Sequence, residues 1–432
     1  MGEKKTRVGG QTFRFEIFES EPSLDSTVFS ANGRSIGART GVFGSLCVLV
    51  FLVNFARVVY APLLEPFRAA FGVSEAAVGL LATLVWIGSA APRFPTGYLL
   101  TRYPRHRIVL GSGLVLAGAS AIAAAAPSFA TLAAATVLVG VGSGVYFVAA
   151  SPLIGQLYPG QVGRAIGIHG TASQVAAVVA PGFVGVALAV RFWPFAAWRG
   201  IFVLLSLAAL GSAILFWLAA RRSTITGPQE LDLDMRVALV AHWRLILSGI
   251  AVVGLAGLVW NGVFNFYVTY LIEAKGLSSG NARTALTVVF AAGVPAFWAA
   301  GVLADRLRFV PLMLAILAVF VGSMLSLVAV QSFVPVLLVS AILGFVIHSL
   351  FPATDTYILA SLPDEHSGSG YAVFSGAMMP IQAIGSVVVG VLVDSGLSYD
   401  AVFTALSLGV AVLTAGLFGL ALLGRVPSGT NV

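Results

Sequence analysis

The sequence predicts an all-α membrane protein of twelve transmembrane helices, arranged as two six-helix bundles in parallel repeat. Three observations lead to this fold class. Hydrophobic residues make up 58% of the 432 residues and charged residues only 9%, which is more apolar surface than a soluble core of this length could bury. Apolar segments long enough to span a bilayer recur twelve times along the chain. Short sequence patterns also repeat at one constant spacing, which indicates an internal duplication.

The apolar segments divide the chain into five regions. Residues 1–41 are a polar tail. Within it, the segment from Phe13 to Phe18 alternates apolar and charged residues, as a strand does; we expect a disordered tail, or else a strand that docks a partner. Residues 42–220 form the N-terminal bundle, 221–243 a polar linker, 244–425 the C-terminal bundle and 426–432 a short tail. The predicted spans are 42–64, 76–100, 108–126, 130–154, 164–190, 199–220, 244–272, 283–304, 309–330, 333–360, 370–393 and 401–424.

The distribution of basic residues predicts the orientation of these spans. Seventeen of the 24 lysines and arginines fall in the tails and in the loops on the same side as the tails, and five fall in the opposite loops. By the positive-inside rule both termini are cytoplasmic, and we expect the protein in the plasma membrane. The first apolar run begins near residue 42 and is long enough to span a bilayer, which argues against a cleaved signal peptide.

Matching patterns in the two halves lie 204 residues apart. Phe71-Gly-Val-Ser74 matches Lys275-Gly-Leu-Ser278, and the offset holds without a gap through other anchors. A parallel duplication of six helices predicts two bundles related by an axis along the membrane normal. The further anchors are Ser128-Phe129 with Ser332-Phe333, Gly140 with Gly344, and Pro159 with Pro363.

A charged turn between the second and third spans of each half carries a family resemblance. Gly301-Val-Leu-Ala-Asp-Arg306 matches the first six positions of the pattern Gly-x-Leu-Ala-Asp-Arg-x-Gly-Arg. This pattern is typical of the major facilitator superfamily, whose members are secondary transporters built from two six-helix halves. The chain resembles that superfamily over residues 42–425 in further features: glycines in the fourth span, Trp198-Arg199 before the sixth and Ala180-Pro181 in the fifth.

The two copies of the charged turn are not equivalent. In the first copy, Gly97 to Arg102, Thr101 stands where the family has aspartate. At the same offset, Ser151 corresponds to Asp355, so both carboxylates belong to the second half. From the resemblance we expect a cytoplasmic gate in which a carboxylate contacts a helix N-terminus, although the arginines could instead serve topology alone. The predicted gating residues are Gly97, Thr101, Arg102, Gly301, Asp305, Arg306 and Asp355.

Two arginines lie within predicted spans. A charge there costs at least about 2.5 kcal/mol, so Arg57 and Arg93 are candidates for binding an anion through planar N–H donors. Either side chain could instead extend to the membrane surface or brace a helix contact. Arg93-Phe-Pro-Thr-Gly97 resembles the nitrate/nitrite porter branch, but Phe297 replaces the second arginine of that branch. Arg57 could supply the second charge, although it lies at a different depth in the membrane.

Polar and aromatic side chains elsewhere in the spans complete the predicted binding site. Asn261 and Asn265 lie in the seventh span, whose outer half faces the cavity in the resembled family. His348 could take part in a proton relay towards Asp355, or could be a neutral histidine buried in a helix contact. The predicted substrate-binding residues are Asn54, Arg57, Trp86, Arg93, Tyr146, Asn261, Asn265 and His348.

These features predict a transporter and not an enzyme. The single cysteine, Cys47, rules out an intramolecular disulfide, and no cofactor or metal site is expected. No phosphate loop is present, so ATP is not the expected energy source. The net charge of +7 follows from topology and does not indicate nucleic-acid binding.

We therefore expect secondary active transport of a small solute, preferably a small or organic anion, by alternating access. An ion gradient, with H+ as a candidate coupling ion, would drive it, and the family norm is a monomer within the lipid bilayer. Two alternatives remain at this stage: an exporter of many drugs with the same fold, and a sensor related to transporters that signals through its tail.

Overall fold

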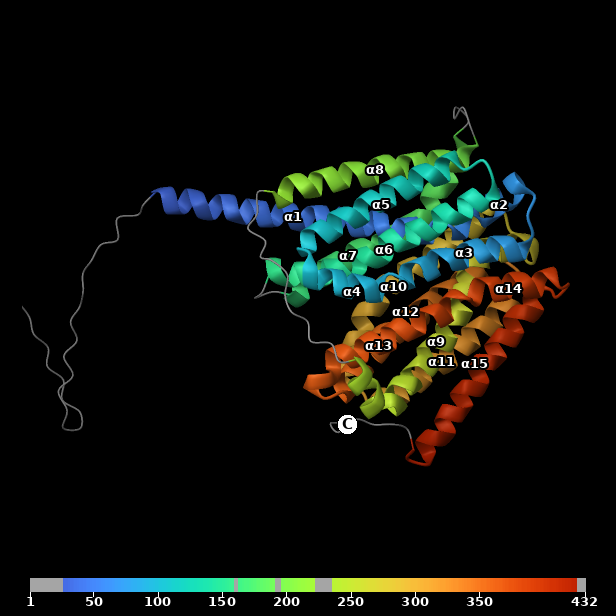
Figure 1. Cartoon of the computed structure of the whole chain (residues 1–432). Helices are drawn as coiled ribbons and strands as arrows, with labels where there is room; N and C mark the ends of the chain where they lie inside the picture. The colour runs from blue at the N-terminus through green and yellow to red at the C-terminus, as the bar shows by residue number, and fades with distance from the viewer. Residues whose placement is uncertain (1–25, 159–161, 191–195, 222–234, 426–432) are drawn as a thin grey trace, which may run out of the picture.

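The computed structural model contains two helical halves that lie side by side (Figure 1). It describes residues 26–158, 162–190, 196–221 and 235–425. The first half runs from α1 to α8 and the second from α9 to α15. Eleven of the helices in the described residues are long and apolar enough to cross a membrane, and α10, with 28 residues, occupies the eighth position of the predicted order.

The first half consists of α1 (Ser26–Val58), η1 (Ala61–Leu63), α2 (Leu64–Phe71), α3 (Glu75–Ala90), α4 (Arg93–Arg102), α5 (Arg105–Ala125), α6 (Phe129–Leu157), α7 (Val162–Ala189) and α8 (Ala197–Ala220). The second half consists of α9 (Met235–Glu273), α10 (Ser279–Arg306), α11 (Phe309–Ala329), α12 (Phe333–Ser361), α13 (Asp364–Ala383), α14 (Gly385–Asp394) and α15 (Tyr399–Leu422).

Helix boundaries differ from the predicted spans in the first and seventh positions. α1 begins at Ser26 and not near residue 42, because a helix can continue into polar sequence that carries no apolar signal. It ends at Val58, and a short 3-10 helix that begins at Ala61 and contains Pro62, which lacks an N–H, precedes α2. α9 begins at Met235, inside the predicted linker, and is kinked at His242. The predicted Phe13 to Phe18 segment lies outside the described residues.

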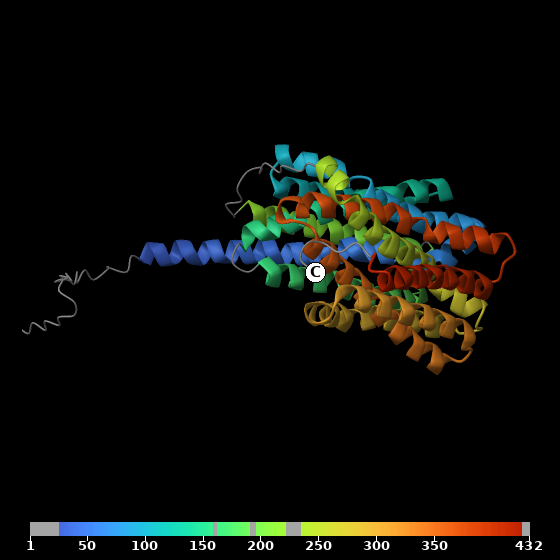
Figure 2. The same ribbon diagram turned by 90° about the horizontal axis from the view of Figure 1, so that it is seen from below.

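The second and eleventh predicted spans are each broken near the middle. The second is divided into α3 and α4 at Ala91 and Pro92, and the eleventh into α13 and α14 at Ile384. Figure 1 shows α3 beside α14 at the end where α2 lies. We call this the far end, and we call the end where α9 begins and α15 terminates the near end. Figure 2 shows the same helices from below, with both halves extending along one direction.

The halves pack tightly at the far end, where α3 contacts α14 and α7 contacts α10. A Cβ atom built on Gly79 of α3 would lie 2.5 Å from the carbonyl oxygen of Ser386, and one built on Gly390 of α14 would lie 2.5 Å from that of Glu75. Both carboxylate oxygens of Asp394 accept backbone hydrogen bonds, from Glu75 at 3.0 Å and Ala76 at 2.8 Å. Asp394 of one half therefore caps the N-terminus of a helix in the other half.

The duplicated anchors adopt the same local structure in both halves. Gly72 and Gly276 have φ values of 62° and 66°, a region that glycine occupies without strain. Two residues later, the Ser74 and Ser278 side chains each accept a hydrogen bond from the backbone of the following helix, α3 and α10 respectively. The repeated Gly-x-Ser pattern thus ends one helix and begins the next at equivalent positions.

Candidate functional site

A polar cavity of about 300 Å³ lies between the two halves. Helices of both halves line it, and its lining side chains, among the residues that the structure describes, include two arginines, several amides and a histidine but no aspartate or glutamate. Larger cavities, such as one of about 620 Å³ beside α10 to α12, have almost entirely apolar linings. The lining residues of the polar cavity are Asn54, Arg57, Val58, Trp86, Arg93, Phe147, Ser173, Gln174, Ala177, Trp260, Asn261, Phe264, Phe290, His348, Phe351, Met378, Met379 and Gln382.

Arg57 enters the cavity from the last turn of α1. Arg57 is only 7% exposed. Its guanidinium carbon lies 3.9 Å from the centroid of the Trp86 ring and 5.2 Å from that of the Phe147 ring. Aromatic faces attract a cation and partly replace the water it has lost. The Nε atom of Arg57 is buried without a hydrogen-bond partner among the described residues. The guanidinium is therefore held in place while a donor remains available.

Arg93 reaches the same cavity from the first residue of α4. The break at Ala91 and Pro92 ends α3, and the chain resumes as a helix at Arg93. The Nε atom of Arg93 is also buried without a partner in the described part of the chain. Although the sequence places Arg57 and Arg93 at different depths in the membrane, both side chains line the same cavity. This is possible because arginine carries its charge at the end of a long side chain. Two guanidinium groups therefore line one cavity in which no described lining residue is a carboxylate.

Amide side chains line the cavity on opposite sides. The Asn54 side chain donates to the backbone carbonyl of Ser173 at 2.7 Å, which ties α1 to α7. The Asn261 amide donates to the carbonyl of Gly257 at 3.2 Å, and its Oδ1 is buried without a hydrogen-bond partner among described residues. The Gln382 amide donates to the carbonyl of Val253 at 3.3 Å. Asn54 and Gln382 thus stabilise the cavity wall, while Asn261 retains an acceptor for a ligand.

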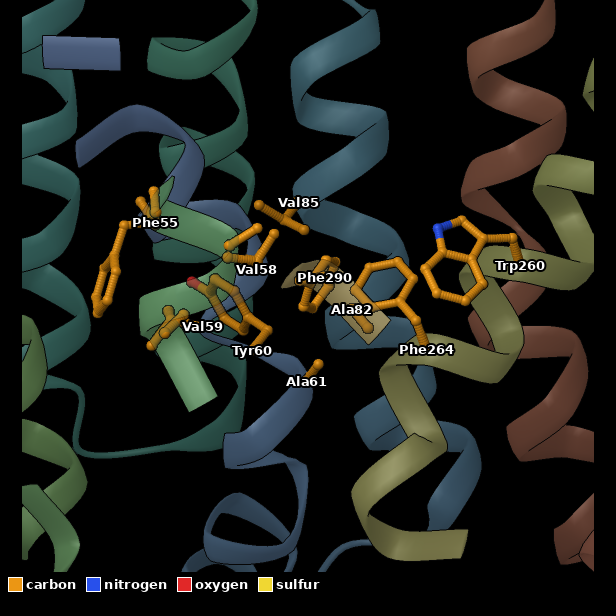
Figure 3. Packing of buried hydrophobic residues seen from close by; sticks show 14 of the residues in the cluster. Phe55, Val58, Val59, Tyr60, Ala61, Ala82, Val85, Trp260, Phe264 and Phe290 are labelled. Carbon is orange, nitrogen blue, oxygen red and sulfur yellow. The ribbon is translucent and has the colours of Figure 1, made fainter. Parts of the chain in front are cut away.

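His348 joins the polar lining to an aromatic floor. Its Nδ1 lies 2.7 Å from the carbonyl of Gly344, which can only accept, so Nδ1 carries a hydrogen. Its ring packs edge-on against Trp260, with centroids 5.7 Å apart. Figure 3 shows Trp260, Phe264 and Phe290 beside Ala82 and Val85. This buried apolar group separates the cavity from the far end.

Two predicted binding residues lie outside the cavity lining. The Tyr146 hydroxyl donates to the carbonyl of Leu46 at 2.7 Å and lies 2.8 Å from Nε2 of His169, which can donate to it. The Asn265 amide donates to Ser386 Oγ at 2.9 Å and also to the carbonyl of Asn261 at 2.9 Å. Both side chains serve helix packing, because buried polar groups in a membrane helix find partners within the protein.

The predicted gating residues lie at the near end, where the structure describes part of the group. α4 ends at Arg102, whose guanidinium lies 4.6 Å from the centroid of the Tyr98 ring. Gly97 has open space around its Cα. Asp355 of α12 is hydrogen-bonded by the Tyr371 hydroxyl, which in turn lies within the electrostatic influence of Arg93. The side chains of Thr101, Asp305 and Arg306, together with Gly301, lie outside the described residues.

The cavity also contains polar residues that the sequence analysis did not select. Ser173 and Gln174 of α7 and Gln382 of α13 line it, and Tyr371 connects Asp355 to the region of Arg93. All four are uncharged polar residues within apolar helices, and this pattern could have marked them as candidates in the sequence. Their helices carry several such residues, however, and sequence alone does not identify those that face the other half.

Two helical halves around a polar cavity, within a chain rich in membrane-spanning helices, define a membrane transporter. The family model described as the Major Facilitator Superfamily matches residues 46–348 and 253–431. The chain therefore belongs to the major facilitator superfamily, with the twelve-helix topology of that fold.

Solved structures of the same fold support this assignment. One is a bacterial homolog of the human lysosomal transporter Spinster in an inward-facing and occupied conformation, with TM-score 0.76 and 18% identity, covering 90% of this chain and 98% of that one. Another is a D-xylose-proton symporter, with TM-score 0.73 and 14% identity, covering 91% of this chain and 99% of that one. No curated protein matches the sequence.

Proposed function

We propose that this protein is a secondary active transporter that carries a small or organic anion across the plasma membrane by alternating access. The observation that supports the choice of solute is the pair Arg57 and Arg93. Both guanidinium groups line one cavity whose described lining residues include no carboxylate, and each keeps a buried Nε donor without a partner among the described residues. A charge within a membrane span costs at least about 2.5 kcal/mol, and an anion placed between the two arginines would offset their repulsion.

The same cavity argues against export of cationic drugs. A cationic solute would need a carboxylate in the binding site, and the lining residues that the structure describes include none. The Trp86 indole N–H is buried without a hydrogen-bond partner among the described residues and gives an anion a further donor, while Trp86, Trp260 and the edge of His348 form an aromatic wall. A small oxyanion such as nitrate, or a compact carboxylate, suits a cavity of about 300 Å³.

The proposed orientation places the near end in the cytoplasm, because lysines and arginines are concentrated in its loops. With the far end closed by α3 and α14, the conformation is then inward-facing. One neighbouring structure is described as inward-facing, in agreement with this assignment. The other neighbour is described as a proton symporter, and we propose H+ as the coupling ion for this monomeric transporter as well.

A flux assay in proteoliposomes tests the proposal. The purified protein would be screened with radiolabelled or competing nitrate, nitrite, phosphate and carboxylates, alongside Arg57→Gln and Arg93→Gln. We expect each variant to raise the KM of the transported anion about 10- to 100-fold, since a charge-assisted hydrogen bond contributes about 1.5–3 kcal/mol. Arg221→Gln is the matched control, because Arg221 stacks on Trp217 at the end of α8, away from the cavity. Full activity of both cavity variants on a neutral or cationic solute would refute the anion assignment.

A further inference from the structure

Four charged side chains meet between the halves at the far end. We call Glu65, Arg68, Glu75 and Glu273 the far-end cluster. Arg68 of α2 forms an ion pair with Glu75, one with Glu273 at 2.9 Å and one with Glu65 at 3.5 Å. Glu273 is the last residue of α9, so this pairing joins the two halves.

The far-end cluster contains more acid than base. Oxygen atoms of the three glutamates all lie within 4.8 Å of one another, and the one guanidinium among them cannot neutralise three carboxylates. Glu75 is only 7% exposed, and its Oε2 is buried without a hydrogen-bond partner among the described residues. A buried carboxylate oxygen without a donor is costly, and a bound proton removes part of that cost.

The environment of Glu65 favours its protonated form. Burial raises the pKa of the Glu65 carboxyl, the nearby charge of Arg68 opposes that rise, and the charge of Glu273 adds to it. Carboxylate oxygens of Glu65 and Glu273 lie within 4.8 Å of each other, and a proton bound to Glu65 removes their repulsion. The Glu65 and Glu273 side chains are each 36% exposed, so solvent at the far end can exchange that proton.

Other ionisable groups around the cluster have their own roles. Asp394 of α14 is bound to the N-terminus of α3. Lys275 and Asp400 form an ion pair with each other at 3.1 Å, within the second half. Tyr399 of α15 faces the cluster with a buried hydroxyl that has no hydrogen-bond partner among the described residues. None of these groups supplies the second positive charge that the three glutamates would need.

We propose that the far-end cluster binds a proton on Glu65, beside Glu273, and that this proton holds the two halves together at the far end. Loss of the proton leaves two carboxylates in contact across the boundary between the halves, and their repulsion favours opening. The closed far end therefore binds the proton more tightly than the open one, in which Glu65 is hydrated. Acid stabilises closure, and that stabilisation is lost as the pH rises through the raised pKa of Glu65.

The proposal does not depend on which solute is carried, so its test needs no substrate. Spin labels would be placed through Ala70→Cys and Leu397→Cys, two exposed positions in opposite halves at the far end, in a Cys47→Ala background. Distance distributions would be measured in nanodiscs at about pH 5 and about pH 8, an acid and an alkaline condition. The unaltered cluster should give mainly the short distance at acid pH and a growing long-distance population at alkaline pH.

Variants at the pair distinguish a proton from a general effect of pH. Glu65→Gln and Glu273→Gln each remove the repulsion and should give the short distance at both pH values. Glu65→Asp retains a titratable group and should retain the pH response. A distribution that does not change with pH, or a shift that persists in both glutamine variants, would refute the proposal. The buffers contain potassium as the only metal cation, and a shift that appears only when sodium is added would equally overturn it.

Discussion

The guanidinium carbon of Arg57 lies 3.9 Å from the centroid of the Trp86 ring, which joins α1 to α3 at the wall of the central cavity. The indole covers one face of the guanidinium, while the buried Nε has no hydrogen-bond partner in the described residues. Trp86 itself packs edge-on against Phe264 of the second half, with centroids 6.3 Å apart. The position of the cavity's first positive charge therefore depends on a contact between the halves.

Replacing Trp86 should weaken solute binding through Arg57. Trp86→Leu keeps an apolar side chain but removes the aromatic face, and a desolvated cation–π contact contributes about 2 kcal/mol. We expect the KM for the transported anion to rise about 10- to 30-fold in proteoliposome flux measurements. In an Arg57→Gln background the same substitution should add little, because the interaction it disrupts is already absent.

A second stacked pair provides the control for this prediction. The Arg221 guanidinium carbon lies 4.5 Å from the centroid of the Trp217 ring, at the end of α8. Trp217→Leu should leave the KM unchanged. Additive effects of Trp86→Leu and Arg57→Gln would show that the two residues act independently, contrary to the structure.

Asp355 and Tyr371 connect the near end to the cavity, and we expect them to govern opening at that end. Asp355→Asn removes the carboxylate that Tyr371 hydrogen-bonds, and Tyr371→Phe removes the donor. Both should disturb the alternation between the open and the closed near end, lower the transport rate and change the alkylation rate of a cysteine introduced as Gly155→Cys, where a side chain has open space. Thr356→Val is the control, because the Thr356 hydroxyl donates within its own helix, to the carbonyl of Pro352. Unchanged transport together with unchanged alkylation in both variants would remove Asp355 and Tyr371 from the gate.

The fold was predictable from the sequence because its signals are local. Apolar length marks the spans, and the repeated glycine and serine of Gly72-Val-Ser74 and Gly276-Leu-Ser278 mark the same turn and helix cap in both halves. The breaks at Ala91 and Ile384 were less visible, because proline and glycine occur in many membrane helices without ending them.

The candidate site was predictable only where a charge lies in an apolar span. Arg57 and Arg93 stand out in this way, and the structure places both at one cavity. Asn265 and Tyr146 carry the same kind of signal, yet each is bound to a partner in a neighbouring helix. A polar residue that stabilises packing and one that faces a cavity look alike in a sequence. The contact between Glu65 and Glu273 was hidden for another reason, because the repeat has no glutamate at the equivalent positions.

Close contact between α3 and α14 should make Gly79 and Gly390 sensitive to a single methyl group. A Cβ at either position would lie 2.5 Å from a backbone oxygen of the other half, which cannot move as a side-chain end could. Gly79→Ala and Gly390→Ala should therefore destabilise the closed far end by about 1–3 kcal/mol, the usual cost of overpacking.

Hydrogen exchange measures this effect directly, because backbone amides of α3 and α14 donate hydrogen bonds to side chains of the opposite helix. The amides of Glu75 and Ala76 donate to Asp394, and that of Val387 donates to Thr83 Oγ at 3.1 Å. In both alanine variants we expect these amides to exchange about 5- to 150-fold faster, as opening becomes easier by the same free energy. Gly118→Ala on α5 meets open space and should leave exchange unchanged. Wild-type protection in Gly79→Ala and Gly390→Ala would mean that these hydrogen bonds do not require the close approach of the two helices.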